Sequence, residues 1–526
     1  MASPAQGKRS ARELVGIAAL LLAAEAVGFA FVVPRAGFYL DDWIFLDLTA
    51  GPGGLLAGMR GMLAAGYAAR PGAILHFAVL GALGGFSPGF YLAVGLALKA
   101  LEGFLLFLLL ERLWRGRAPA LAAAALAVLH PARAATHFWY CNSNQGVASC
   151  LVLGSLLVHE AWLRRGGTAR LLGSLALYLA GALFYESGAL LPLALAAVVV
   201  LRRRGTGPRP EEARRLPLGL ALYGACLLAV LAWIWSAAPG SLEVKLGRAP
   251  ISPLGTYGAG FASILWRSLW LCWRSAELLW ETTGPGPLAA AAAAGAALAG
   301  SLGRLEAHRP AASGSAALAA VTAAAIFIAA YGPLVAGGYR PDVFGALSRF
   351  NAIGAWAGAI LLVALVELAV RRRAGLRATS WGFLAAAFLC ADWYAGARWA
   401  EAAELQRDVL AKAAARARGL ARGATLILSD APGWVGGVPL FTESWAFELA
   451  LRRATGRRDL SARVVSGRLA FEKEGIVERA GAAQPRGTPP VRASYRDTYL
   501  YRYGSDSLER LEGPPRGRSV SYSWRE

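Results

Sequence analysis

Long apolar runs, separated by short clusters of arginine, are the feature that most constrains how this chain can fold. Residues 14–33 are apolar apart from Glu25, and similar runs recur as far as residue 396. Hydrophobic residues make up 56% of the 526 residues and charged residues only 17%, which is more apolar surface than a soluble chain of this size can bury. Because a membrane-spanning helix needs about 20 apolar residues, the pattern predicts a polytopic membrane protein.

Eleven apolar segments are candidate transmembrane helices. They are residues 12–33, 88–111, 118–134, 146–163, 171–185, 187–201, 216–236, 285–302, 312–332, 350–370 and 380–396. A single helix over 171–201 would be ~46 Å long, so two short helices with Glu186 at the tip of a hairpin are expected instead. Residues 71–86 and 261–280 are expected to lie in the outer interface, although either segment could instead be a further span.

The arginine clusters predict the orientation of the chain. Basic residues gather near the N-terminus and in residues 111–117, 164–170, 202–215, 304–309 and 371–377, and the positive-inside rule places all of these in the cytoplasm. These clusters contain many of the arginines that give the chain its formal net charge of +21. Because the sequence has no nucleic-acid recognition motif, a nucleic-acid partner is not expected. Eleven crossings then put the N-terminus inside and the chain after residue 397 outside.

The composition changes near residue 400. Residues 401–526 are more charged, with an Ala-, Glu- and Arg-rich helical stretch followed by candidate strands at 424–428, 462–465 and 497–503. The fold class is therefore an all-α polytopic membrane domain over residues 1–400, followed by a tail with a small α/β domain outside the membrane. The tail contains no histidine, and the five cysteines of the chain have no metal-ligand spacing, so neither suggests a metal or nucleophile site.

An acidic pair, Asp41-Asp42, directly follows the first apolar run. Two adjacent carboxylates repel one another and are costly beside hydrocarbon, which favours a functional role. Leu40 and Trp43 flank them with apolar bulk that would raise a carboxylate pKa toward the range of a general base. The pair could also hold a divalent metal ion, and the alternative to function is a helix cap, for which aspartate is well suited.

Other polar residues gather in the loops predicted to face outward. Glu186, within an apolar hairpin, is a second catalytic candidate. Arginines in these loops suit a phosphate, whereas the aromatic and amide residues of 137–144 suit a sugar or a lipid headgroup. Each also has a plain structural explanation, as an ion pair, a packed histidine or an aromatic belt. The candidate binding residues are Arg70, His76, His137, Asn142, Asn144, Arg340 and Arg349.

Three sequence features occur in an order that resembles the glycosyltransferase C (GT-C) superfamily. They are Tyr39-Leu40-Asp41-Asp42-Trp43 after the first span, then Arg70-Pro71, then the hairpin sequence from Phe184 to Pro192. The resemblance covers residues 10–400 and rests on order and topology. It implies transfer of a sugar from a polyprenyl-phosphate lipid to an acceptor on the non-cytoplasmic face, with an aspartate of the first outer loop as the base.

The resemblance further implies that an outer arginine, Arg349 or Arg340, neutralises the lipid phosphate and that the anomeric centre inverts in a single displacement. The expected partners are a polyprenyl-phosphate-linked sugar, the membrane lipid and a glycan, lipid or protein acceptor. The Ala-, Gly- and Arg-rich composition favours the inner membrane of a bacterium, and hence a role in the cell envelope. The alternatives are a transporter or flippase of lipid-linked glycans, an O-antigen ligase or polymerase type of enzyme, and a non-catalytic membrane scaffold.

Overall fold

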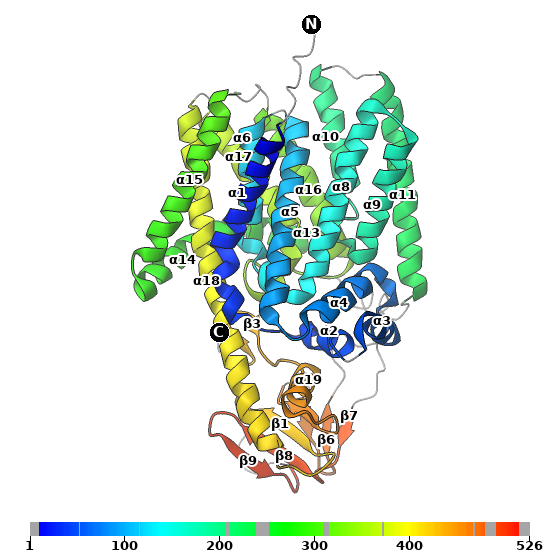
Figure 1. The fold of residues 1–526 in the computed structure, drawn as a ribbon, viewed down its shortest axis with the longest axis vertical. Helices are drawn as coiled ribbons and strands as arrows, with labels where there is room; N and C mark the ends of the chain where they lie inside the picture. Colours follow the sequence, from blue (N-terminus) through cyan, green and yellow to red (C-terminus); the bar gives the residue numbers. More distant parts are fainter. Residues whose placement is uncertain are drawn as a thin grey trace.

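A bundle of long helices with a small mixed domain at one end makes up the fold of the computed structural model (Figure 1). The structure describes residues 10–51, 53–114, 116–206, 210–237, 252–308, 315–370, 373–466, 469–478 and 491–514. Parts of the predicted loops lie outside these ranges. They are residues 239–251, which were predicted to face outward, and the basic residues Lys8, Arg9, Arg115, Arg309, Arg371 and Arg372.

Seven described helical segments are long and apolar enough to cross a membrane. Six helices account for most of them, with bounds α5 (Pro88–Trp114), α8 (Ser143–Arg165), α11 (Pro210–Ala237), α15 (Gly286–His308), α16 (Ser315–Ala336) and α18 (Ala374–Ala417). The seventh segment is α1 (Ala11–Phe29) with the turn η1 (Ala30–Arg35). The turn η7 (Gly345–Asn351) and α17 (Gly354–Val370), bent by 70°, form an eighth if counted together. The chain is therefore a multi-pass membrane protein by helix length and composition.

The remaining predicted spans are helical but shorter. They are α6 (Arg117–Val128), α9 (Thr168–Phe184) and α10 (Leu191–Thr206). The eleven predicted segments therefore correspond to seven long helical segments, the bent segment of η7 and α17, and these three short apolar helices. Every residue of α6 from Ala118 to Val128 is buried by protein, so this helix does not need to match the lipid thickness. The predicted break at Glu186 is confirmed, because the turn η5 (Glu186–Gly188) separates α9 from α10. The two helices do not form a tight hairpin, since α9 packs mainly on α8 and α10 mainly on α16.

Four further helical segments lie at the end of the bundle nearest the small domain, which we call the outer end after the predicted orientation (Figure 1). Three form a group beside the first outer loop, α2 (Asp41–Thr49), α3 (Gly54–Ala64) and α4 (Pro71–Gly84). The fourth segment runs from α13 (Pro253–Ala262) through a π-helical turn, η6 (Ser263–Arg267), into α14 (Ser268–Thr283). Neither α4 nor α14 is a candidate span, and the tryptophans of the α14 region, Trp266, Trp270, Trp273 and Trp280, are exposed as in an interfacial helix.

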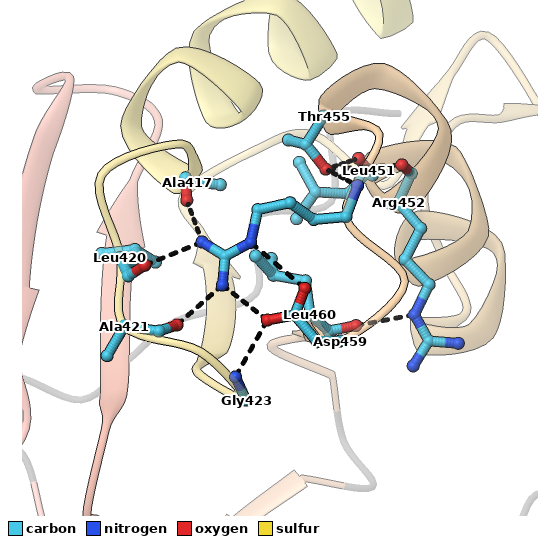
Figure 2. A network of polar contacts seen from close by, with 10 residues as sticks. Ala417, Leu420, Ala421, Gly423, Leu451, Arg452, Thr455, Asp459 and Leu460 are labelled. Carbon is cyan, nitrogen blue, oxygen red and sulfur yellow. Dashed lines mark hydrogen bonds and ion pairs between the residues drawn. The ribbon is translucent and has the colours of Figure 1, made fainter.

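The last helix of the bundle, α18, continues beyond it into the tail (Figure 1). With 44 residues it is about 66 Å long, so the predicted last span and the predicted helical stretch after it are one rod. Its end is fixed by Arg457, which donates to the carbonyl oxygens of Ala417 (3.1 Å), Leu420 (2.8 Å) and Ala421 (2.7 Å). Figure 2 labels these three residues and marks their hydrogen bonds as dashed lines. A cation is favoured at a helix C-terminus, and Asp459 holds this one in place at 2.7 Å.

The tail contains the predicted α/β domain. Its main sheet has the order β4 (Ser461–Val464), β1 (Thr425–Ser429), β8 (Thr498–Arg502), β9 (Ser507–Arg510). The strand β1 is parallel to β4 and β8, and β9 is antiparallel to β8. Two smaller antiparallel sheets complete it, one of β2 (Trp434–Val435) and β3 (Val438–Pro439), the other of β5 (Leu469–Phe471), β6 (Ile476–Glu478) and β7 (Val491–Ala493).

One hydrophobic cluster joins the tail to the outer helices. Trp43, Phe45 and Leu46 of α2 belong to the same buried cluster as Phe441 and as Phe447 of α19 (Ser444–Thr455). The Arg453 guanidinium adds a cation–π contact to the Phe86 ring at 3.9 Å. This shared core, together with α18, sets the tail directly against the outer end of the bundle, where the acidic pair lies.

Candidate active site on the outer face

The acidic pair follows a strained residue. Leu40 has φ +40°, in the region that favours glycine, and α2 begins at the next residue. Asp41 and Asp42 are thus in the first turn of a helix, where the unpaired backbone N–H groups favour negative charge. Since successive helical residues point about 100° apart, the two carboxylates face different surroundings.

Asp42 is a structural anchor. Its side chain is fully buried and its two oxygens accept the backbone N–H groups of Tyr39, at 2.9 Å, and Cys141, at 2.8 Å. Trp139 completes the link by donating its indole N–H to the Tyr39 carbonyl at 3.0 Å. Burial raises the pKa of Asp42 well above its usual range, partly opposed by these backbone hydrogen bonds. Asp42 therefore ties the first outer loop to the segment around residue 140.

Asp41 has a different environment. It is half-buried, and no described residue donates a hydrogen bond to its carboxylate. Burial raises its pKa, the Arg349 guanidinium opposes this, and the negative charge of Glu443 adds to it. Burial thus raises the pKa of both aspartates, which is the direction expected from the sequence. Of the two aspartates, Asp41 is the one whose oxygens are open to a ligand.

Arg349 lies close enough to Asp41 for its positive charge to lower the Asp41 pKa. Its guanidinium lies over the ring of Trp139 at 4.5 Å and near that of Phe350 at 5.0 Å. The turn η7 is fixed beneath it, because the Ser348 hydroxyl accepts the Ala135 N–H at 2.9 Å. Within the described part of the chain, no carboxylate lies within the 4.0 Å of an ion pair with Arg349. The stacked guanidinium keeps its N–H edges for an anion.

Arg70 and Glu186, predicted separately, form one ion pair. The Arg70 guanidinium donates to both Glu186 oxygens, at 3.0 Å and 2.6 Å, and stacks on the Tyr185 ring at 4.5 Å. Tyr67, three residues before Arg70, interacts with Asp41; burial first and then this charge raise the Tyr67 pKa to about 12. We use the name outer polar cluster for these residues together, Asp41, Tyr67, Arg70, Tyr185, Glu186 and Arg349.

Other predicted residues are more deeply buried than expected for an open loop. His137 is 3% exposed, stacks on Phe29 at 3.9 Å and contacts Glu25 at 3.3 Å. Asn142 donates to the Ala135 carbonyl at 3.3 Å, and Asn144 is also buried. The aromatic segment is therefore packed into the bundle, although His137 Nδ1 and Asn144 Oδ1 are buried without a hydrogen-bond partner in the structure. A sugar- or headgroup-binding role for this segment stays a prediction.

The two remaining candidates lie at the edges of the site. His76 is half-buried and its Nε2 makes a hydrogen bond of 2.7 Å with the Ser143 hydroxyl. Arg340 is exposed on the loop after α16. Neither is in the outer polar cluster, so of the arginines proposed for a phosphate, Arg349 has the more suitable surroundings.

Glu443 is the residue that sequence reasoning missed. It lies in the tail, immediately before α19, and reaches the site only because α19 packs on α2. The local sequence carries no signal for this contact, which joins residues about four hundred positions apart.

The acidic pair does not fit a chelating metal site, because both Asp42 oxygens already accept backbone N–H groups. Among the described residues, no group of three or more His, Cys, Asp or Glu side chains is arranged to hold a metal ion.

Comparisons with known proteins give a distant structural likeness. Neither a protein-family model nor a curated protein matches the sequence. Among solved structures, ArnT from Cupriavidus metallidurans in the apo state is 14% identical with a TM-score of 0.40, over 86% of this chain and 85% of that chain. The same protein bound to undecaprenyl phosphate is 14% identical with a TM-score of 0.42, over 87% of each chain. A likeness this distant does not by itself assign a family or a function.

Proposed function

We propose that this protein is a membrane glycosyltransferase that moves a sugar from a polyprenyl-phosphate lipid to an acceptor hydroxyl on the non-cytoplasmic face of a bacterial inner membrane. The N-terminus would then be cytoplasmic and the tail periplasmic. One observation carries the proposal, which is the charge interaction between Asp41 and Arg349. Asp41 is a half-buried carboxylate that accepts no hydrogen bond from a described residue. Among the described residues, no carboxylate lies at ion-pair distance from the Arg349 guanidinium, which stacks on Trp139. A base and an anion site are thus held beside each other.

Arg349 would bind the phosphate of the lipid donor. A guanidinium can bind two phosphate oxygens at once. Its contacts with the rings of Trp139 and Phe350 fix the orientation of the guanidinium plane. As the bond between the sugar and the phosphate breaks, negative charge grows on the leaving oxygen. A fixed cation stabilises that charge more in the transition state than in the bound donor, which is the requirement for catalysis.

Asp41 would act as the general base. Its carboxylate takes the proton of the acceptor hydroxyl, whose oxygen forms a bond to the anomeric carbon while the polyprenyl phosphate leaves with the bonding electrons. A single displacement of this kind inverts the anomeric centre. The raised pKa brings Asp41 closer to that of an effective base at neutral pH.

The pair Arg70–Glu186 would position the site. Because both Glu186 oxygens are held by Arg70, Glu186 is better suited to fix Tyr185 and Arg70 than to take a proton. This assigns Glu186 a supporting role in place of the catalytic role considered from the sequence. The pair joins the turn η5, which contains Glu186, to the residue that precedes α4. It thereby links two separate segments of the outer polar cluster.

A transporter is the second candidate, because ionisable residues are also buried within the bundle. Lys99, Glu102 and Arg133 are all at most 2% exposed, and intramembrane charges of this kind are typical of ion or proton pathways. However, Glu102 accepts hydrogen bonds from both cations and from Trp356, so this group is closed rather than open to a substrate. The observation favours a structural role.

A comparison of cell-envelope glycolipids by mass spectrometry tests the proposed function. Cells lacking the gene should accumulate the unmodified acceptor and lose one glycosylated product, and the wild-type chain should restore it. Asp41→Asn should fail to restore the product, while Asp47→Asn, at an exposed position of the same helix, should restore it fully. Restoration by the Asp41 variant to the wild-type level would refute the assignment of the base. Loss of lipid translocation with unchanged glycans would favour the transporter.

A further inference from the structure

The turn η7, which carries Arg349, is held in place by two buried polar side chains. Ser348 directly precedes Arg349, Asn351 is the last residue of the turn, and both side chains are fully buried. The Ser348 hydroxyl accepts the Ala135 N–H at 2.9 Å and donates to the Gly345 carbonyl at 2.8 Å. The polar atoms of Ser348 are thus used within the protein, and they fix the backbone beside Arg349 to the segment around residue 135.

Asn351 uses its whole side-chain amide in the same way. Its Nδ2 group donates to the Asp342 carbonyl at 2.7 Å and to the Ala132 carbonyl at 3.0 Å. Its Oδ1 accepts the Tyr331 hydroxyl at 2.6 Å. Because an amide has two N–H donors and one carbonyl oxygen, only this orientation gives every group of the amide a partner. Asn351 therefore ties η7 to α16, to the turn η3 (Pro131–Arg133) and to the loop that precedes η7.

The Tyr331 hydroxyl reaches Asn351 because two glycines leave room for it. Tyr331 lies on α16 and is 0% exposed. A Cβ at Gly354 would overlap its hydroxyl, and a Cβ at Gly260 would overlap its ring. The hydroxyl is also 3.4 Å from the Gly260 carbonyl, but it has one proton, and the Asn351 oxygen is the closer acceptor. The contact between Tyr331 and Asn351 is therefore built into the packing of α13, α16 and α17.

The tail and the π-helical turn η6 hold η7 from other sides. The Gly437 carbonyl, between β2 and β3, accepts the Ala346 N–H of η7 at 3.1 Å. A Cβ at Gly345 would collide with that carbonyl, and Gly345 also has φ +65°. In the loop before η7, the Asp342 carboxylate pairs with Arg267 of η6 at 2.8 Å. The turn is thus fixed from several sides by contacts within the chain.

We propose that Tyr331 and Asn351 are positioning residues, which hold η7 so that the Arg349 guanidinium keeps one orientation toward the phosphate of the lipid donor. This inference rests on the proposed function, since it needs Arg349 to bind that phosphate. Neither residue would touch the donor, because both are fully buried and bonded to other parts of the chain. A guanidinium whose support is already rigid loses less freedom when it binds, so more of the contact free energy appears as affinity.

Binding of undecaprenyl phosphate to the purified full chain, measured by native mass spectrometry, tests the inference. Tyr331→Phe removes one hydroxyl and keeps the ring, so it should weaken binding by about three- to tenfold, as expected for one lost hydrogen bond. Tyr223→Phe is the matched control, because Tyr223 is 3% exposed and its hydroxyl shares a hydrogen bond of 2.7 Å with that of Ser155, between α11 and α8. It should lower the melting temperature by a similar amount and leave binding unchanged.

Two further variants sharpen the test. Ser348→Ala breaks the link to Ala135 on the other side of Arg349, and it should weaken binding in the same way. Combining Tyr331→Phe with Arg349→Gln should weaken binding no further than Arg349→Gln alone, because Tyr331 acts only through Arg349. A general loosening of the bundle would instead add its own loss to that of Arg349→Gln.

The outcomes separate the two proposals. If Arg349→Gln binds the lipid as the wild-type chain does, the phosphate-binding role of Arg349 in the proposed function fails. If Arg349→Gln binds more weakly but Tyr331→Phe and Ser348→Ala bind as the wild type does, the inference fails and the proposed function stands. The same holds if Tyr223→Phe weakens binding as much as Tyr331→Phe. Should Tyr331→Phe not fold, as judged by its melting temperature, Ser348→Ala decides.

Discussion

Two groups of charged side chains, one inside the bundle and one on its outer face, are bonded in opposite ways. Inside, the Glu102 carboxylate accepts from Lys99 at 3.0 Å, Arg133 at 2.6 Å and the indole of Trp356 at 2.8 Å. Outside, Asp41 and Arg349 interact through their charges without a direct hydrogen bond. The first group is bonded within the protein apart from Arg133 Nε, which has no partner among the described residues, whereas the Asp41 carboxylate and the Arg349 guanidinium make no hydrogen bond to each other.

The difference teaches which ionisable residues can act on a substrate. Burying three charges costs several kcal/mol of desolvation for each, which pairing offsets. The interior group joins α5, the turn at 131–133 and α17, and both oxygens of its one carboxylate are already bonded. The outer group sits where water or a ligand can complete it. By hydropathy alone, both groups are charged residues in apolar surroundings. Their hydrogen bonds distinguish the interior group, which has a structural role, from the outer group, which is proposed to bind substrate.

Breaking the interior group should give the largest effect on stability. Glu102→Leu removes the countercharge of Lys99 and Arg133, and leaving such cations buried and unpaired costs about 3–5 kcal/mol. We expect a much lower melting temperature in detergent and little folded protein. Glu401→Gln, which removes half of a surface pair with Arg398, should cost less than about 1 kcal/mol. Equal melting temperatures for the two variants would contradict the structural role of the interior group.

The outer group should respond in the opposite way, with loss of binding and unchanged stability. Arg349→Gln should weaken binding of undecaprenyl phosphate, used as a probe, by about 10- to 100-fold, because a charged hydrogen-bond donor is lost. Arg349→Lys should lie between, since it keeps the charge but not the planar, two-point contact. Native mass spectrometry of the purified chain can measure both. Arg340→Gln is the matched control, and a loss there but not at Arg349 would exchange the roles of the two arginines.

The pair Arg70–Glu186 is intermediate between the interior group and Asp41–Arg349. Its two side chains form an ion pair with each other, yet each is about one-third exposed. A positioning pair predicts that Arg70→Met, Glu186→Gln and the double variant reduce the transfer rate by similar amounts. Two residues that bind substrate independently would instead give losses that multiply in the double variant. Transfer rates of all three variants at saturating donor, compared as a double-mutant cycle, distinguish these cases.

Much of the fold, but less of the site, could be predicted from the sequence. Apolar runs give helices directly, and the strands at Thr425–Ser429 and Thr498–Arg502 follow from their composition. Helix length was harder, since the 12 residues of α6 lie inside the protein and need not match the bilayer. In the site, the acidic pair was found, but the sequence cannot tell Asp41 from Asp42, because their difference comes from backbone N–H groups of Tyr39 and Cys141.

The residues that sequence reasoning misplaced or missed depend on long-range contacts. His137 looked like an outer-loop residue because aromatic and amide neighbours are typical of an interface, yet it turns inward to Glu25, 112 positions earlier. Glu443 meets α2 only through the packing of a separate domain. Local patterns report propensity and hydropathy, whereas such contacts are decided by how helices and domains pack together.

The pH dependence should distinguish the outer group from an ordinary exposed carboxylate. A base must be ionised, so transfer falls as the pH is lowered through the pKa of Asp41. Burial raises that pKa, so the fall should occur above the pKa of about 3.9 of a free aspartate. The titratable groups that act on or feel this charge are Asp42, Tyr67, Cys141, Arg349 and Glu443. A rate that stays constant down to pH 4, with the protein folded, would show that Asp41 is not the base.

The strained residue that introduces the acidic pair should give the smallest effect. Leu40 has φ +40°, so Leu40→Gly relieves about 1 kcal/mol of backbone strain but increases the entropy of the unfolded chain by a similar free energy. The free energy of unfolding should therefore change by less than about 1 kcal/mol, while Leu40→Val, with a branched side chain at a positive φ, should lose more. If the strain serves to aim Asp41, the glycine variant should keep its stability and lose part of its transfer rate. Equal transfer by both variants and the wild type would show that the strain is incidental to the site.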